Sequence, residues 1–507
     1  MEKVLIQDLK TFENQKVSIS GWLTNKRSGK GLEFLIVRDG SGFTQCIVDE
    51  TKVNEKVFQQ AKDISQESSL QLKGKVVKDE RQIGGYEIHV ETLEIIQLAS
   101  NYPISNKPHG VEFLMDNRHL WLRSKRQWAI MRIRNRIIFS IHNFFQKEGF
   151  IQMDAPVFTG NAVEGTTTLF ETTFYEDRAY LTQSGQLYGE AMAMAMGKIY
   201  TFGPTFRAEK SKTRRHLSEF WMIEPEMAFY NLDMNMDLIE NFIKHILKDV
   251  KEHCTQEFEI IERDTTSFDK IINERFPRLT YDYAVNVLTG KEKVNGKTTI
   301  ETLEGDYNLV ISEIEEKQKQ VDEAENEMKQ SIKQGKRNFL QNKVDTLKNE
   351  IKDLEDKKRV IPDWIKSAKE FEYGSDLGGS DETVITRMFD LPLMVYNWPH
   401  EVKAFYMKRD EQNSNLAKGV DVLAPEGYGE IVGGGERETN EELLVGKINE
   451  HKLPMEAFEW YLDLRRFGSV PHAGFGLGLE RMVAWVCKLK HIRETIPFPR
   501  MYGRLFP

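Results

Sequence analysis

Over the first hundred residues, apolar and polar positions alternate in short runs, which is the pattern of half-buried β-strands. Such runs cover residues 17–23, 33–38, 43–48, 70–77 and 86–93, and a helical pattern covers residues 55–64. Turn signals at Asp39-Gly40-Ser41-Gly42 and Gly84-Gly85 separate some of them. Five strands of this length predict a small Greek-key barrel of the OB-fold type. Many barrels of this kind bind single-stranded nucleic acid, and others are purely structural.

The pattern changes after residue 100. Pro103 and Pro108 interrupt it, which predicts a linker over residues 101–119 and a second domain over residues 120–507. Helical spacing of apolar residues then runs from Trp128 to Phe145. Residues 101–150 hold nine Lys/Arg against three Asp/Glu. This basic helix could face phosphate, or it could be a core helix with a solvated charged face.

Residues 307–360 are rich in Glu, Lys, Gln and Asn, with sparse apolar residues three, four or seven apart. That spacing predicts two helices, and Gly335 lies near the midpoint. We therefore expect an antiparallel helical hairpin, inserted in the second domain. A solvated coiled coil is the favoured interpretation of this insert, and contact with a tRNA or a protein is the alternative.

Composition narrows the class of protein. The chain has 507 residues, 40% of them hydrophobic and 29% charged, which suits a globular protein of two to four domains. A net charge of −9 disfavours a histone-like or coating protein and gives no sign of a DNA partner. Cys46, Cys254 and Cys487 have no metal or disulfide spacing, which suits a reducing cytoplasm. With no apolar run of about 18 residues and no signal core, we expect neither secretion nor a membrane contact.

Two segments have the composition of a ligand site. The pattern of residues 201–224 predicts a strand, a basic loop and a second strand. The loop could present cations to a polyphosphate. Alternation would put Arg207 and Glu209 on one face of the first strand. Residues 473–485 predict a glycine-rich strand that turns into an apolar helix near Arg481. Glycines let a ligand approach the backbone, but they also allow tight packing.

Together these segments resemble the signature motifs of class II aminoacyl-tRNA synthetases. Phe206-Arg207-Ala208-Glu209 is similar to the second motif, residues 474–481 to the third, and residues 149–158, which contain Pro156, to the first. The N-terminal barrel marks the subgroup for Asp, Asn and Lys. Residues 181–190, 402–407 and 496–500 are most similar to the asparaginyl branch.

The resemblance implies an α+β enzyme whose catalytic domain is built on an antiparallel sheet flanked by helices. Its expected activity is ATP-dependent activation of L-asparagine to the adenylate, followed by transfer to the 3′ end of tRNA(Asn). It also implies a homodimer, with Pro156 at the interface.

The resemblance assigns ATP and Mg²⁺ to particular residues. Arg207 is expected on the α-phosphate and the substrate carboxylate, and Arg481 and His216 near the γ-phosphate; both arginines are expected to be catalytic. Further ATP contacts are expected from Phe220 and Arg481, which would enclose adenine, and from Glu209, Leu217 and Glu430. The expected magnesium ligands are Asp421 and Glu430.

Four residues are expected to bind the amino acid. Glu164 and Gln186 match acceptors for the ammonium group, and Arg437 matches a donor to the side chain of the substrate. Aspartyl enzymes carry a lysine where this chain has Gly189, and Glu190 follows it. Glu190 would accept from a carboxamide and repel a carboxylate, unless it only begins a helix.

In the barrel, the resemblance assigns Phe34 to stacking on the central anticodon base and Gln45 to a base edge. Arg27 would contact a phosphate and Glu87 a neighbouring base. The alternative places these side chains in the core of the barrel.

Three other functions remain open. An aspartyl or non-discriminating enzyme is disfavoured by Gly189, and an ammonia-dependent asparagine synthetase by the barrel. A non-catalytic RNA-binding protein would have no use for a complete nucleotide site.

Overall fold

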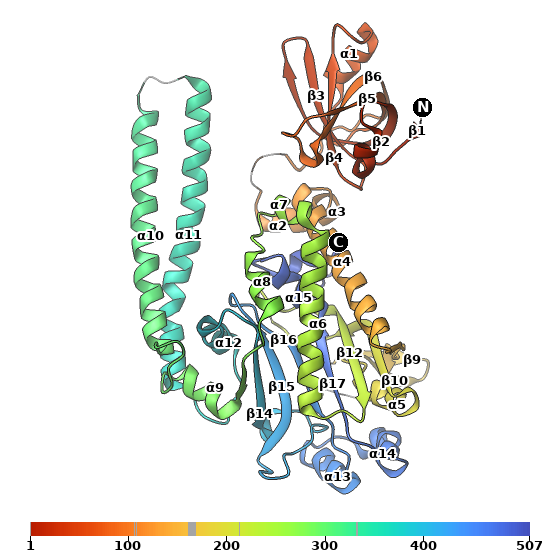
Figure 1. The fold of residues 1–507 in the computed structure, drawn as a ribbon, viewed down its shortest axis with the longest axis vertical. Coiled ribbons are helices and arrows are strands. Elements are labelled where there is room, and N and C mark those ends of the chain that lie inside the picture. Colours follow the sequence, from red (N-terminus) through yellow and green to blue (C-terminus); the bar gives the residue numbers. More distant parts are fainter. Residues whose placement is uncertain (1, 106, 108, 161–168, 212, 331–332) are drawn as a thin grey trace. The chain divides into compact units, whose positions relative to one another are not determined.

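The computed structural model describes residues 2–507 except 106, 108, 161–168, 212 and 331–332. The chain divides into two compact units, which we name the barrel unit (Met1–Ser124 with Pro507) and the sheet unit (Lys125–Phe506). Each is described by itself (Figure 1).

The barrel unit has the predicted five-stranded barrel, closed by pairing between β2 and β5. Its elements are β1 (Glu2–Lys3), η1 (Ile6–Phe12), β2 (Lys16–Gly29), β3 (Leu32–Arg38), β4 (Phe43–Asp49), α1 (Glu55–Asp63), β5 (Ser69–Lys78), η2 (Ile83–Gly85) and β6 (Tyr86–Gln97). Successive side chains of a strand point to opposite faces, and every second one enters the barrel core. On β3 and β4 the fully buried residues are accordingly Leu35, Val37, Cys46 and Val48. Helices α2 (Val111–Asp116) and α3 (Arg118–Trp121) follow and belong to the same unit.

The sheet unit is built on an eight-stranded sheet in the order β13-β14-β15-β16-β17-β12-β11-β7. The six inner strands are antiparallel, as expected, and the edge strands β13 and β7 each pair in parallel with a neighbour. The strands are β7 (Ile151–Gln152), β11 (Lys198–Phe206), β12 (Glu219–Ala228), β13 (Arg278–Thr280), β14 (Leu393–Pro399), β15 (Leu416–Ala424), β16 (Gly429–Glu436) and β17 (His472–Gly478). A small second sheet contains β8 (Phe158–Thr159), β9 (Glu171–Phe174) and β10 (Asp177–Leu181).

Helices cover one face of the large sheet. There α4 (Lys125–Lys147), α6 (Leu232–His253) and α15 (Leu479–Val486) lie across the strands and share the main hydrophobic core with them (Figure 1). The cations of α4 pair with acids of the same unit, among them Arg136 with Asp249, which favours the interpretation of α4 as a core helix. The remaining helices are α5 (Gln186–Met196), α7 (Thr255–Ile260), α8 (Thr266–Asn273), α9 (Tyr281–Leu288), α12 (Gly379–Ile385), η4 (Thr386–Met388), η5 (His400–Val402), α13 (Glu441–Glu450), η6 (Met455–Phe458), α14 (Glu459–Arg466) and η7 (Ile492–Glu494).

The predicted hairpin consists of α10 (Thr299–Met328) and α11 (Gln334–Glu370), which extend beyond the predicted range at both ends (Figure 1). Its base packs on α9 and α12 through buried Leu303, Val310 and Ile361. Its distal part has an apolar cluster of its own, made of Val321, Ala324, Leu340, Val344, Leu347 and Ile351. Along the described residues, no helix has the length and apolar character needed to cross a membrane.

Candidate active site

Alternation along β12 sends its side chains to opposite faces of the sheet. Ile223 and Met227 enter the helix-covered core, whereas Glu224 and Glu226 point to the other face. On β15, Val420 and Val422 are core residues and Asp421 faces the same way as the glutamates. The uncovered face of the sheet is therefore lined by carboxylates.

The glycines of β17 make room on this face. A Cβ atom at Gly474 would lie 2.2 Å from Glu226 Oε1, and one at Gly476 would lie 2.7 Å from the Met222 methyl carbon. Side chains of β12 therefore lie over β17 where any larger residue would collide with them. The glycine-rich motif permits this packing in the structure.

A cavity of about 910 Å³ opens on this face, which suits a nucleotide together with a small amino acid. The structure brings ten predicted residues together around it: Gln186, Arg207, Glu209, His216, Leu217, Phe220, Asp421, Glu430, Arg437 and Arg481. Strand β11 ends at Phe206, so Arg207 and Glu209 follow the strand instead of lying on its face.

One end of the cavity is rich in cations. Arg481 donates to the Glu430 backbone oxygen at 2.9 Å and to its Oε2 at 3.1 Å. Arg215 pairs with Glu382 at 3.0 Å, and the Arg207 guanidinium lies 5.7 Å from the centre of the Phe220 ring. Burial and the Arg481 charge lower the pKa of His216, which favours its neutral form. This end can hold a polyphosphate.

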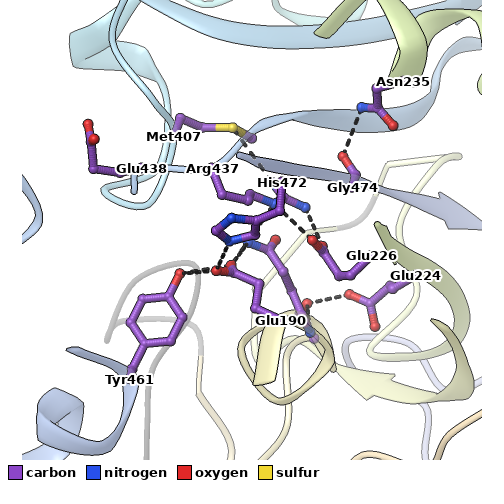
Figure 2. Close-up of polar contacts among 12 residues, drawn as sticks. Glu190, Glu224, Glu226, Asn235, Met407, Arg437, Glu438, Tyr461, His472 and Gly474 are labelled. Carbon is purple, nitrogen blue, oxygen red and sulfur yellow. Dashed lines mark hydrogen bonds and ion pairs between the residues drawn. The ribbon is translucent and has the colours of Figure 1, made fainter. Parts of the chain in front are cut away.

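The other end holds a buried ion pair between Arg437 and Glu226 (Figure 2). Arg437 Nη2 lies 2.5 Å from Glu226 Oε1, and Nε lies 3.3 Å from Oε2. Both side chains line the cavity, with Tyr406 beneath the guanidinium at 5.3 Å. Burial raises the pKa of Glu226 to about 7, against the opposing effect of Arg437. The pair offers a donor and an acceptor at one place.

Glu190 lies next to this pair, between Tyr461 and Glu226 in Figure 2, with its Oε1 4.0 Å from Arg437 Nε. Its carboxylate accepts from Gln186 at 3.1 Å, from Tyr461 at 2.8 Å and from Arg465 at 2.8 Å, and it lies 2.9 Å from His472 Nε2. Burial acts to raise the pKa of Glu190, but the charges of Arg465, His472 and Arg437 outweigh it and hold the pKa below its usual range. Among the residues described, Glu190 is not part of the cavity lining. Glu226, which lines the cavity, is therefore better positioned than Glu190 to contact a substrate directly.

Gly189 links the two glutamates. A Cβ atom there would lie 3.2 Å from Glu226 Cγ. Gly189, the position at which aspartyl enzymes carry a lysine, is therefore in direct contact with Glu226 in this chain. The start of α5 is fixed by Glu224, which accepts from Ser184 Oγ and, at 2.7 Å, from the Gly185 backbone N–H. The predicted Glu164 lies outside the described residues.

The comparisons with known proteins decide the family. Residues 110–502 match the family of "tRNA synthetases class II (D, K and N)", and residues 17–96 match the "OB-fold nucleic acid binding domain". The chain is 45% identical to an asparagine–tRNA ligase of Symbiobacterium thermophilum, over the full length of both, and 47% identical to that of Sorangium cellulosum over 99% of each. It is 35% identical to the asparaginyl-tRNA synthetase of Pyrococcus horikoshii, a structure complexed with asparaginyl-adenylate, with a TM-score of 0.81 and full coverage of both chains.

The chain belongs to the asparaginyl-tRNA synthetases of class II. It is thus an aminoacyl-tRNA ligase, as the three motifs predicted.

Two carboxylates of this asparaginyl-tRNA synthetase site have the chemistry of magnesium ligands. Asp421 and Glu430 converge at Gly433, where a Cβ atom would lie 2.8 Å from Glu430 Oε1 and 3.6 Å from Asp421 Oδ1. Two hard oxygen donors at one place suit Mg²⁺ that also binds phosphates. No group of three or more His, Cys, Asp or Glu among the described residues could hold a metal, so ligands from the nucleotide would be needed.

In the barrel of this synthetase, alternation sends Phe34 away from the core and toward Arg27, whose guanidinium lies 4.5 Å from the ring centre. Gln45 donates to Glu87 at 2.9 Å, and Gln45 and Phe34 share one face of the β3–β4 pair. The four residues predicted to read the anticodon thus form two pairs: Arg27 with Phe34, of which Arg27 is exposed, and Gln45 with Glu87, which are both buried. In the sheet unit, Pro156, which was predicted at a dimer interface, is exposed between β7 and β8.

Sequence reasoning missed several residues of the synthetase site, among them Glu226, Arg215 and Lys403. Glu226 lies two residues beyond Glu224 on β12, and alternation could have placed it on the same face as Glu224. Arg215 lies in the basic loop and Lys403 in the 402–407 motif, but no sequence signal pointed to their carboxylate partners.

Proposed function

We propose that the protein activates L-asparagine with ATP and transfers it to tRNA(Asn). The observation that carries this choice is the Glu226–Arg437 pair beside Gly189. Glu226 can accept from the NH₂ of a carboxamide while Arg437 donates to its oxygen. A second carboxylate oxygen of aspartate would meet the Glu226 charge, and no lysine replaces Gly189 to neutralise it.

Adenylation requires that negative charge on the α-phosphate be neutralised while the carboxylate attacks. Arg207 and Arg481 line the cavity at the cation-rich end, and we assign them to the α- and γ-phosphates, with His216 beside them. Phe220 and Arg481 would enclose adenine, Leu217 would also contact ATP, and Glu209 would accept from the adenine amino group. Asp421 and Glu430 would hold Mg²⁺, which supplies further charge neutralisation when bound. Glu164 and Gln186 are proposed to accept from the ammonium group.

We assign residues 1–100 to anticodon binding, 101–119 to the linker and 120–507 to catalysis, with the 307–360 hairpin as an insert. The pair of exposed Arg27 and half-buried Phe34 supports the first assignment, because an aromatic ring stacks on an unpaired base and a cation binds phosphate. Gln45 and Glu87 would contact base edges. Three buried, unpaired cysteines favour a reducing compartment, the cytoplasm.

ATP–pyrophosphate exchange on the purified protein tests the proposal. With Mg²⁺, exchange should require L-asparagine and be about 10- to 100-fold weaker with L-aspartate, because facing a like charge or losing a buried hydrogen bond costs about 1–3 kcal/mol. Exchange with both amino acids would instead identify a mixed-specificity enzyme. Formation of asparagine from aspartate and ammonia would identify an asparagine synthetase.

Charging assays complete the test. The full chain should aminoacylate tRNA(Asn) transcripts and lose most of this activity when the central anticodon base is changed. Phe34→Ala should raise the KM for tRNA and leave pyrophosphate exchange unchanged; an unchanged KM would contradict the anticodon assignment.

A further inference from the structure

Lys403 belongs to the 402–407 motif, to which the proposed function gives no role. It follows η5 and lines the cavity, and its side chain is 14% exposed. The ammonium donates to Asp421 Oδ2 at 2.5 Å and lies 3.9 Å from the centre of the buried Trp398 ring. Both contacts act on the same cation, so the structure holds it firmly against Asp421.

At the cation-rich end of the cavity, two described cations besides Lys403 are each paired with a carboxylate. Arg481 binds Glu430 at 3.1 Å, and Arg215 binds Glu382 at 3.0 Å. The two proposed magnesium ligands, Asp421 and Glu430, are therefore each engaged by a side-chain cation. A divalent ion could bind them only if these cations release oxygen atoms that they now contact.

We propose that Lys403 acts as a counter-ion that blocks Asp421, so that a divalent cation binds this site only together with a triphosphate. This inference rests on the proposed function, which supplies the metal and the nucleotide. Displaced from Asp421 by a metal alone, the lysine would remain a largely buried cation that has lost its hydrogen-bonded carboxylate, which is unfavourable. A triphosphate brings new anionic oxygens, to which the flexible lysine side chain can transfer its ammonium.

The simpler alternative is that Lys403 only stabilises the fold by neutralising Asp421. The two roles differ in what they predict for metal binding without nucleotide. A structural role predicts that removing the charge lowers stability and adds no metal site. A counter-ion role predicts that removing the charge exposes Asp421 beside Glu430 and creates metal affinity.

Titration with Mn²⁺, followed by electron paramagnetic resonance, separates the two roles on the full chain without nucleotide. The wild-type protein should bind Mn²⁺ weakly. Lys403→Met should bind one Mn²⁺ per chain at least tenfold more tightly, and Lys403→Arg, which keeps the charge, should behave as the wild type. Lys408→Met is the matched control, because Lys408 pairs with Glu411 and Glu436 away from the cavity lining.

Two results would overturn the proposal: tight Mn²⁺ binding by the nucleotide-free wild type, or no gain of affinity in Lys403→Met. A circular dichroism spectrum like that of the wild type verifies that Lys403→Met has folded, and a non-hydrolysable ATP analogue is used to measure nucleotide binding separately. If Lys403→Met does not fold, Lys403→Gln is tested in its place. Gln is smaller and polar, and this variant should show the same gain of Mn²⁺ affinity.

The same titration with the analogue tests the metal site itself. Mn²⁺ should then bind the wild type, and Asp421→Asn or Glu430→Gln should weaken this binding at least tenfold. If both substitutions leave it unchanged, the magnesium assignment fails and the role of Lys403 fails with it. Pyrophosphate exchange with asparagine would still stand as a separate test of the activity.

Discussion

Glu226 and Arg437 are the residues at which discrimination between asparagine and aspartate can be tested. Glu226→Gln keeps the size of the side chain but can turn an NH₂ toward the substrate. The loss of one buried acceptor costs about 1–3 kcal/mol, so kcat/KM for asparagine should fall about 10- to 100-fold and that for aspartate should rise. Pyrophosphate exchange with both amino acids measures the change. Equal losses for both would assign Glu226 to positioning instead.

The raised pKa of Glu226 adds a dependence on pH. The pKa is about 7, so the carboxylate is charged above that pH and carries a proton below it. As pH falls from 8 to 6, the KM for asparagine should rise about tenfold, since a single group of pKa 7 is mostly protonated at pH 6. The KM for aspartate should fall, because a protonated Glu226 can donate. Glu226→Gln should remove both trends, and a flat profile in the wild type would contradict this prediction.

Glu190 belongs to the support of this pair. It is fully buried among Arg465, Tyr461 and His472, so Glu190→Gln leaves Arg465 with a buried, unpaired charge. Loss of one partner from such a pair costs about 3–5 kcal/mol, and thermal unfolding should begin at a clearly lower temperature. Glu450→Gln, which removes an exposed partner of Arg409, is the control and should change little. Equal effects of the two substitutions would refute the supporting role.

Among the elements, the hairpin can be divided into a base and a distal part. Val310 and Ile361 of the base are fully buried against the sheet unit, whereas the distal cluster packs only within the hairpin. Lys317 and Glu350 face each other across the two helices at 2.7 Å and mark the boundary. Replacing residues 318–349 by a four-residue glycine-rich turn should therefore preserve pyrophosphate exchange within about twofold, because the retained base keeps its core contacts.

Deleting residues 307–360 is the matching comparison. It removes Val310 and the partly buried Leu354 from the core, so this variant should unfold at a lower temperature than the shorter deletion. Loss of exchange in the shorter deletion would show that the distal helices take part in activation.

The elements could be predicted from the sequence where a local period sets them. The barrel strands and the β11–β12 hairpin follow from alternation within each segment, whereas Gly335 lies in the first turn of α11 and not between the two helices. The contacts of the site could not be predicted in this way. Glu226 meets Arg437 across 211 positions, and Glu190 meets Tyr461 across 271. Such pairs depend on the strand order of the sheet, which no local pattern contains.

At the scale of the whole molecule, the exposed apolar side chains near the first motif support a homodimer. Phe139 of α4, Ile151 of β7 and Phe158 of β8 are 52%, 44% and 49% exposed. Large exposed apolar side chains are typical of subunit interfaces, and the exposed Pro156 lies between Ile151 and Phe158 in the chain. Light scattering after gel filtration should give twice the chain mass of 59.0 kDa.

Charge placed on this surface should weaken the dimer. Ile151→Glu combined with Phe158→Glu should shift the mass toward one chain at low micromolar concentration, because a dimer would bury both charges without partners. Phe467→Glu is the control, since Phe467 is 76% exposed but lies far from the first motif in the sequence. If the control also dissociates the dimer, or if neither variant does, the interface lies elsewhere. A monomeric double variant that keeps its thermal stability but loses exchange would further show that the active site depends on the partner subunit.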